Sequence, residues 1–299
     1  MARPYPVAAS AAVELALVGP PRQAAVVAAT SQAAYLIVDD ERQTMISLVT
    51  PTAVRVPCAL VLDGKVPAHL PAPGMIATVG NGMVVLDGAV FRVARWWRPP
   101  RPRGLGAVAP ATLANAVRWL TGSVADPLDP AGRAAVADLV QTLAVGEPVE
   151  PAVSRLLGRG PGLTPTGDDV LAGALVGLSA LGSPVAATLG AAVMAAAPDA
   201  TTTVSVALLR HAVRGECIPQ LADLLDAIAR DVSGLPRAAG GLLAVGHCSG
   251  AGLLHGVLVA LAIAHDRLAV GVLSAGAATR AAAAAALSAV TAATAAAAA

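Results

Sequence analysis

The residues best suited to chemistry lie together in residues 158–173, which read GRGPGLTPTGDDVLAG. Glycines let backbone N–H groups approach a ligand closely, and an apolar helix pattern begins directly behind Asp168 and Asp169. A helix start offers unpaired N–H groups and the positive end of the helix dipole to an anion. The two carboxylates, expected at an exposed helix start, could hold a divalent cation such as Mg²⁺ or move a proton. The segment therefore predicts an anion and metal site, or else a capped helix whose carboxylates only complement the dipole.

A second segment, residues 201–216, reads TTTVSVALLRHAVRGE. Its hydroxyl groups, Ser205 among them, stand at a helix start, where they cap the helix or bind a ligand. Arg210 and Arg214 are four residues apart and share a helix face. Such a pair can clamp a carboxylate or a phosphate, or it can simply face solvent.

A third segment, residues 246–256, reads GHCSGAGLLHG and also places small and polar residues before an apolar helix. His247 is suited to proton transfer. His255 falls about two turns along the helix and is interpreted as a core residue. Cys248 is interpreted as a small buried residue, because nothing in the sequence fixes a base beside it.

These segments are expected to converge, since separate capped helices would not need glycine so densely. We expect residues 164–169, 201–205 and 247–250 to line one cleft with Arg210 at its edge, and three unrelated caps are the alternative. The expected substrate-binding residues are Gly160, Gly162, Thr164, Thr166, Gly167, Ser205, Arg210, Ser249 and Gly250. The expected catalytic residues are Asp168, Asp169 and His247, with both aspartates as metal ligands.

Composition and cysteine spacing exclude several classes of function. The net charge of +1 gives no general field for nucleic acid. The three cysteines are far apart, which argues against a disulfide framework and a structural zinc site and favours the cytoplasm. No signal-peptide pattern opens the chain. Residues 170–197 contain no charged residue and would be long enough to span a membrane. Gly182-Ser183-Pro184 divides them into two short runs, however, so no membrane span is expected.

The first hundred residues predict β-structure. Short β-branched runs at 33–38, 46–50, 53–62, 75–80, 83–86 and 89–94 alternate with turn signals. The Asn-Gly and Asp-Gly pairs are the strongest hairpin signals among these turns, and they lie at Asp63-Gly64, Asn81-Gly82 and Asp87-Gly88. The expected fold class is α+β, with an antiparallel β barrel or sandwich-like domain over residues 1–98. The arginine- and proline-rich residues 92–103 are interpreted as an exposed linker, and a stacking platform for nucleic acid at Trp96 and Trp97 is the alternative.

The remainder of the chain predicts helices. Helical patterns cover residues 111–120, 131–144, 168–181, 185–197, 203–214, 220–232 and 250–264. They define an expected helical domain over residues 105–280 that carries the glycine-rich loop. The nearly pure alanine of residues 281–299 is expected to form a frayed tail.

The three segments, in this order behind a β-rich half that ends in a Trp-Pro stretch, resemble the AllH subunit family of oxamate carbamoyltransferase. The resemblance covers roughly residues 20–275, and its most specific mark is the G-x-G-x-G-L-T-P-x-G-D-D string. The residues that match the family's two glycine-rich strings are Gly160, Gly162, Thr164, Thr166, Gly167, Asp168 and Asp169, and His247, Ser249 and Gly250.

The resemblance implies carbamoyl transfer between oxalurate and phosphate, giving oxamate and carbamoyl phosphate, in allantoin and purine nitrogen catabolism. It implies an enzyme built from three different subunits, so partner subunits are expected. Asp168 and Asp169 would then hold Mg²⁺, Arg210 would meet a carboxylate and His247 would assist proton movement. Two other functions stay open: a non-catalytic, anion-binding or regulatory subunit, and a different enzyme acting on anionic acyl or phosphoryl substrates.

Overall fold

The computed structural model describes residues 4–63, 71–123, 127–230 and 232–273. The expected alanine tail at 281–299 lies outside these residues. The chain divides into two units, one of Met1–Pro100 with Glu216–Pro219 and the other of Arg101–Gly215 with Gln220–Ala299. None of the helices in the described part of the chain is long and apolar enough to cross a membrane.

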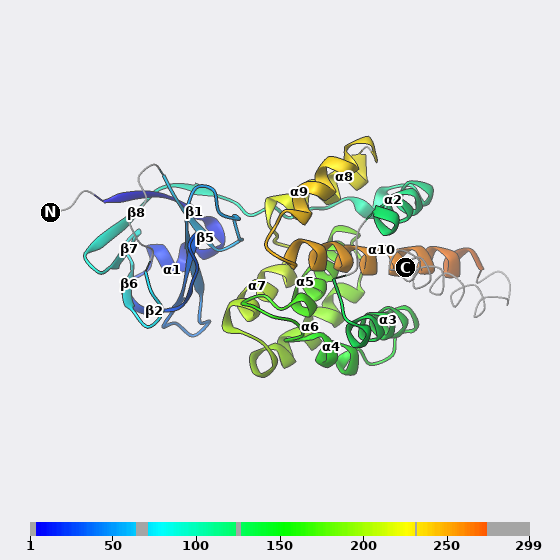
Figure 1. Cartoon of the computed structure of the whole chain (residues 1–299), viewed down its shortest axis with the longest axis horizontal. Helices are drawn as coiled ribbons and strands as arrows, with labels where there is room; N and C mark the ends of the chain where they lie inside the picture. Colours follow the sequence, from blue (N-terminus) through cyan, green and yellow to red (C-terminus); the bar gives the residue numbers. More distant parts are fainter. Residues whose placement is uncertain (1–3, 64–70, 124–126, 231, 274–299) are drawn as a thin grey trace. The chain divides into compact units, whose positions relative to one another are not determined.

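The first unit is a closed β barrel (Figure 1). Its strands are β1 (Tyr5–Ser10), β2 (Arg22–Ala29), β3 (Ala33–Val38), β4 (Met45–Val49), β5 (Ala59–Leu62), β6 (Ile76–Gly80), β7 (Met83–Leu86) and β8 (Ala89–Trp97). The short helices η1 (Ala11–Val13) and α1 (Glu14–Val18) lie between β1 and β2. Alternating strand residues such as Leu36 and Val38 are fully buried and fill the interior.

The expectation of an antiparallel barrel or sandwich is wrong in two respects. The strand order β1-β5-β4-β3-β2-β6-β7-β8 closes on itself, so one barrel replaces the two packed sheets of a sandwich. The pairs β1·β8 and β4·β5 are parallel. Closure by β1 removes the exposed edge that an open sheet would leave on β8.

Two of the hairpin predictions are confirmed, whereas the predicted linker begins too early. The signal at Asp63-Gly64 continues into residues 64–70, which lie outside the described residues. Asn81-Gly82 joins the antiparallel strands β6 and β7, and Asp87-Gly88 joins β7 and β8. All four turn residues have positive φ, as two-residue hairpins of this hand require. Strand β8 continues to Trp97 because it pairs with β1, so Arg92 and Arg95 belong to the barrel.

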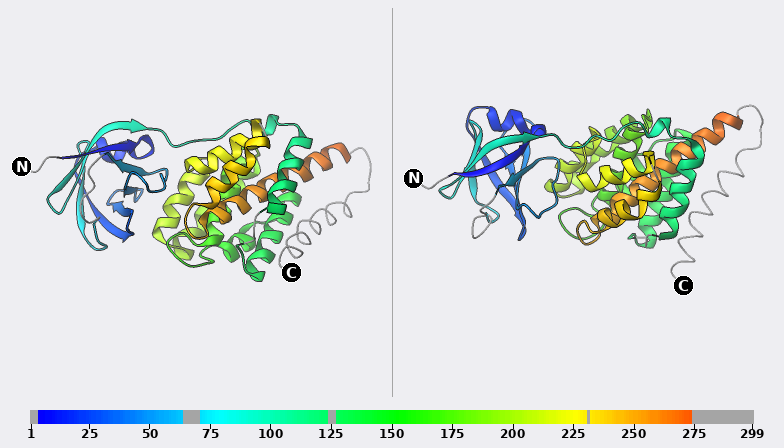
Figure 2. Two further views of the ribbon diagram at one scale, coloured as in Figure 1. Left: turned by 45° about the horizontal axis from the view of Figure 1, so that its top comes forward. Right: turned by 90° about the horizontal axis from the view of Figure 1, so that it is seen from above.

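The second unit is helical (Figure 2). It contains η2 (Leu105–Ala107), α2 (Pro110–Ser123), α3 (Pro130–Val145), α4 (Glu150–Leu156), α5 (Thr166–Ala180), α6 (Val185–Ala200), α7 (Thr203–Val213), α8 (Pro219–Arg230), η3 (Val232–Gly234), α9 (Leu235–Leu243) and α10 (Ser249–Leu273). The seven expected helices are present. The sequence reading missed α4 and α9, which have only 7 and 9 residues.

Helices α5 and α10 form the most closely packed pair of this unit. Glycine makes the approach possible, because a Cβ on Gly173 would overlap the carbonyl of Leu253 and one on Gly256 would overlap the carbonyl of Val170. This contact brings the first turns of α5 and α10 together, which is where the glycine-rich segments lie.

Candidate functional site

The glycine-rich loop joins the end of α4 to the start of α5. Gly158, Gly160 and Gly162 have φ values of +70°, +114° and +93°, which side chains rarely adopt. A Cβ on Gly158 would also overlap the carbonyl of Ala200 at the end of α6. The Gly167 N–H donates to the Arg159 carbonyl (2.8 Å), which folds the loop back on the first turn of α5.

Asp168 ties the loop to the start of α7. Its Oδ1 accepts from the Gly158 N–H (2.8 Å), and its Oδ2 accepts from the hydroxyls of Ser205 (2.6 Å) and Thr201. Asp168 is only 2% exposed and Asp169 8%, so the expectation of an exposed helix start is wrong. The loop and the neighbouring helices cover both side chains. Asp168 therefore positions two chain segments that lie more than thirty residues apart.

The neighbouring carboxyl of Asp169 lies in a different environment. Burial raises its pKa from 3.8 to about 8, Asp168 adds to the rise, and the hydrogen bond with Ser249 opposes it. Its Oδ2 is buried and makes no hydrogen bond to the residues that the structure describes. A buried polar atom without a partner is rare in native proteins and marks a place where a ligand or solvent can bind.

Hydrogen bonds made by side-chain hydroxyls bring the three predicted segments together. Thr164 Oγ1 and Ser249 Oγ lie 2.9 Å apart, and Thr166 Oγ1 donates to Cys248 Sγ at 3.2 Å. Thr202 Oγ1, which also caps α7, donates to the Leu163 carbonyl at 2.5 Å. These hydrogen bonds bring the three segments together, so the segments are not three unrelated caps. That they line one cleft stays a prediction. We call this group of segments, residues 164–169, 201–205 and 247–250, the hydroxyl cluster.

The other predicted site residues differ in burial and in their distance from these contacts. Gly250 packs against α9, since a Cβ there would overlap the Leu242 carbonyl, and Ser205 is buried against Asp168. His247 is exposed just before α10. Arg210 lies in the last turn of α7, about 12 Å along the helix axis from the cap at Thr202. Its expected place at the edge of the hydroxyl cluster therefore stays a prediction.

The carboxyl oxygens differ in their availability to a metal ion. Within the described parts of the chain, no three His, Cys, Asp or Glu side chains are grouped closely enough to hold one. A cation at Asp168 would have to share oxygens that already accept hydrogen bonds, one at Oδ1 and two at Oδ2. Asp169 Oδ2, in contrast, accepts no hydrogen bond from the described residues.

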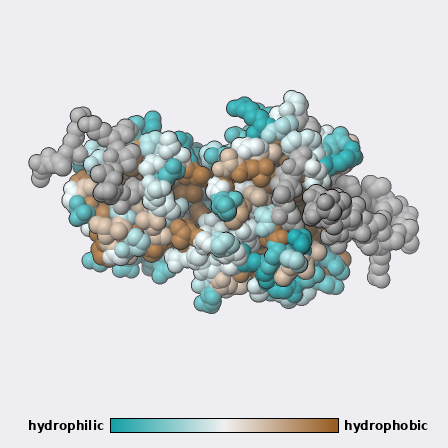
Figure 3. All heavy atoms as spheres, in the orientation of Figure 1, coloured by the Kyte–Doolittle hydropathy of each residue, from teal (hydrophilic) through white to brown (hydrophobic). Residues whose placement is uncertain are grey.

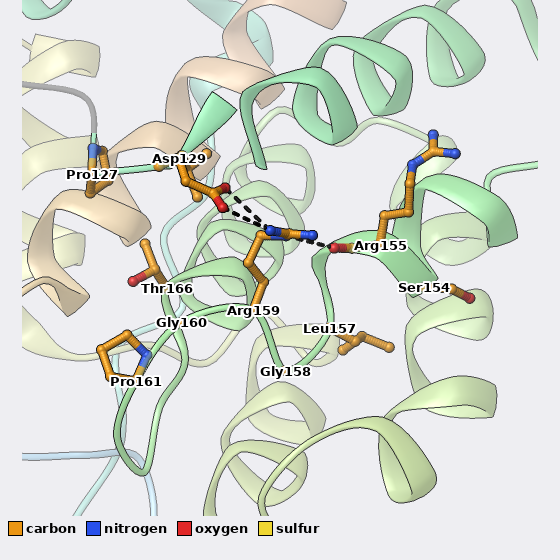
Figure 4. Close-up of a pocket in the computed structure, with 11 residues that line it drawn as sticks. Pro127, Asp129, Ser154, Arg155, Leu157, Gly158, Arg159, Gly160, Pro161 and Thr166 are labelled. Atoms are coloured by element: carbon orange, nitrogen blue, oxygen red, sulfur yellow. Dashed lines mark hydrogen bonds and ion pairs between the residues drawn. The ribbon is translucent and has the colours of Figure 1, made fainter. Parts of the chain in front are cut away.

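A pocket of about 580 Å³ opens beside the loop. Eleven residues line it: Pro127, Leu128, Asp129, Ser154, Arg155, Leu157, Gly158, Arg159, Gly160, Pro161 and Thr166 (Figure 4). Gly160 and Thr166 are among the residues expected from the sequence, whereas Asp129, Arg155 and Arg159 are not. The position of Arg159 between two glycines was the available signal. Asp129 gave none, because it is thirty residues away in the sequence.

The helical unit thus has the local features of a protein that binds a small polar ligand: a glycine-rich loop, convergent hydroxyls, buried carboxyls and a pocket with cationic side chains. Comparison with protein families relates part of this unit to one family. The family model described as oxamate carbamoyltransferase subunit AllH matches residues 156–261. This match confirms the resemblance over the glycine-rich loop and the starts of α7 and α10. No curated protein and no solved structure matches the chain.

Proposed function

We propose that this protein is a subunit of a carbamoyltransferase that interconverts oxalurate plus phosphate with oxamate plus carbamoyl phosphate. The observation that carries the proposal is the coincidence of two independent features. The matched residues 156–261 contain all three segments of the hydroxyl cluster, and hydrogen bonds join these segments in space. The family name is that of a subunit, so the proposal includes at least one partner chain. It also includes the role in purine nitrogen catabolism that the resemblance implies.

The reaction sets requirements that the cluster can meet. A phosphate oxygen attacks the carbamoyl carbon of oxalurate, the bond from that carbon to the oxamate nitrogen breaks, and this nitrogen takes up a proton. Both substrates are anions, so the site must hold them together and neutralise charge on the transferred group. The half-buried hydroxyls of Thr164 and Ser249 donate one to the other, and either could turn its hydrogen towards a substrate oxygen that takes its partner's place. Asp169 and His247 stay the predicted proton-handling groups, and Asp168 is a positioning residue.

Magnesium stays part of the proposal in a reduced form. Mg²⁺ is commonly held by one or two carboxylates together with substrate phosphate. Asp169 would supply that carboxylate, since Asp168 is engaged by three donors. The ion would neutralise charge on the phosphate.

The test is a turnover assay on the assembled enzyme. The tagged full chain is captured from its native cells with its bound partners, and oxamate formation from oxalurate and phosphate is measured. Thr164→Val removes the hydroxyl that faces Ser249 and should lower kcat/KM by about tenfold or more. Thr142→Val is the matched control, because that hydroxyl bonds only to backbone carbonyls within α3.

Two outcomes distinguish a subunit that takes part in catalysis from a non-catalytic one. Turnover by the captured complex but not by the isolated chain supports a subunit role. If the isolated chain binds oxalurate and its Thr164→Val variant leaves turnover of the complex unchanged, the chain is a non-catalytic, anion-binding subunit. Absence of oxalurate binding and of turnover in every assembly would refute the proposal.

A further inference from the structure

The pocket beside the loop is distinct in its lining from the hydroxyl cluster and shares with it only Thr166. Its walls come from the residues before α3, the end of α4 and the first half of the loop (Figure 4). Its volume of about 580 Å³ lies within the range of small-molecule sites. Hydrophilic residues gather over α3 and α4 on the face shown in Figure 3, so the surroundings suit a polar ligand.

Arg159 is the side chain of this pocket that is best arranged to recognise an anion. Its Nε donates to the Arg155 carbonyl (3.1 Å), which fixes the plane of the guanidinium. Its Nη1 donates to both carboxylate oxygens of Asp129, at 3.0 and 3.3 Å. Its Nη2 makes no hydrogen bond to any residue within the described ranges. A guanidinium has five donors in a fixed fork, so donors remain for a ligand.

The other arginine of the pocket is engaged elsewhere. Arg155 forms an ion pair with Asp138 at 2.5 Å. Its side chain points away from that of Arg159 in Figure 4. Arg159 is thus the arginine of the pocket whose ion-pair partner also lines the pocket, since Asp129 belongs to the lining and Asp138 does not.

The ion pair between Arg159 and Asp129 can be exchanged for a ligand. The side chain of Asp129 is 56% exposed and that of Arg159 33%, so water screens the pair and makes it weak. A phosphate or carboxylate bound in the fork makes two parallel charge-assisted hydrogen bonds, which are stronger than a single contact. Asp129 is thus a competitor for the group that a ligand would use.

We infer that this pocket binds a small oxyanion, the phosphate or the carboxylate of a substrate, through Arg159, and that Asp129 competes for the same guanidinium. The inference rests on the proposed function for the choice of ligand, and it makes Arg159 a specificity-determining residue. It gives the protein an anion subsite beside the hydroxyl cluster, where one of two anionic substrates is held.

The experiment is calorimetric titration of the full chain with inorganic phosphate and, separately, with oxamate, at constant pH and ionic strength. Arg159→Gln should weaken binding by tenfold or more, because it removes a charge-assisted pair. Asp129→Asn should tighten binding by up to about fivefold, because it removes the competing charge. Asparagine still accepts from the Gly132 N–H (2.7 Å) and so preserves the cap of α3.

Two further variants separate recognition from folding. Arg159→Lys keeps the positive charge but loses the fork, so it should bind less tightly than wild type and more tightly than Arg159→Gln. Arg230→Gln is the matched control, because it breaks a similar exposed ion pair with Asp226 (3.4 Å) on α8, outside the pocket lining. All variants should retain the wild-type circular dichroism spectrum.

The opposite signs of the Arg159 and Asp129 effects are the decisive result. Binding of phosphate alone, of oxamate alone, or of both in competition supports the inference and identifies the group recognised. Wild-type affinity in Arg159→Gln, weaker binding in Asp129→Asn, or no binding by the folded wild-type chain would overturn it. Carbamoyl transfer that persists without this binding refutes the pocket alone. Binding without transfer in the assembled enzyme refutes the proposed function alone.

Discussion

Replacing the two adjacent carboxylates by asparagine should have different consequences. Asp168→Asn keeps the shape of the side chain but replaces one acceptor oxygen by a donor. The Gly158 N–H needs the remaining oxygen, so the amide must face the hydroxyls of Thr201 and Ser205 and turn them into acceptors. Charge-assisted hydrogen bonds contribute about 1.5–3 kcal/mol each, and part of this survives, so we expect a loss of about 1–3 kcal/mol in unfolding free energy.

Asp169→Asn should instead change the pH dependence of stability. Because the carboxyl pKa is raised from 3.8 to about 8 on folding, folding favours the protonated form. The stabilisation is complete below pH 3.8 and is lost progressively as the pH rises towards 8. At pH 7 the pH lies about three units above the unfolded-state pKa of 3.8. The unfolding free energy lost by then through ionisation of Asp169 is therefore at most about 4 kcal/mol. Asparagine cannot ionise, so the variant should gain on wild type between pH 5 and pH 8.

Urea denaturation followed by circular dichroism at several pH values between 5 and 8 measures both effects. We expect the stability difference between Asp169→Asn and wild type to shift steadily in favour of the variant as the pH rises. The cost of Asp168→Asn should remain at every pH. A flat difference for Asp169→Asn, or equal effects of the two substitutions at pH 8, would refute the distinct environments that the structure assigns to the two carboxyls.

Three further predictions concern packing, domain organisation and the metal. Gly256→Ala should destabilise the protein by at least about 1–3 kcal/mol in thermal melts, because the added methyl group overlaps the Val170 carbonyl. Gly240→Ala on α9 is the control, since its methyl group meets open space and the change should be neutral or slightly stabilising. Limited proteolysis should cut between Arg98 and Gly104, after the end of β8, and release a β-rich and a helical fragment; protection there with cleavage elsewhere would contradict that boundary. Calorimetry with Mg²⁺ and phosphate should show a loss of Mg²⁺ affinity in Asp169→Asn, and unchanged affinity would remove the metal role.

Local chemistry determined several features that could be predicted from the sequence. Asn81-Gly82 and Asp87-Gly88 specified their hairpins because two adjacent positive φ values strongly favour these residue types. The longer helices followed from their periodicity. The glycine-rich strings before α5 and α10 indicated that helix starts would meet, because glycine permits the close backbone approach that such a meeting needs.

Only the tertiary structure decided which distant strands pair and which environment each charged side chain has. The parallel pairing of β1 with β8 joins strands far apart in the chain, so no local pattern specifies it, and it turned the predicted linker residues Arg92 and Arg95 into strand. Asp168 and Asp169 are neighbours of the same type in the sequence. Successive residues of a helix point about 100° apart, so the carboxyl of Asp168 meets one donor from its own loop and two from the start of α7. The carboxyl of Asp169 is buried with one oxygen unpaired among the described residues. The pairing of Arg159 with Asp129 was likewise fixed by how α3 and α4 pack, since long-range contacts depend on the whole fold.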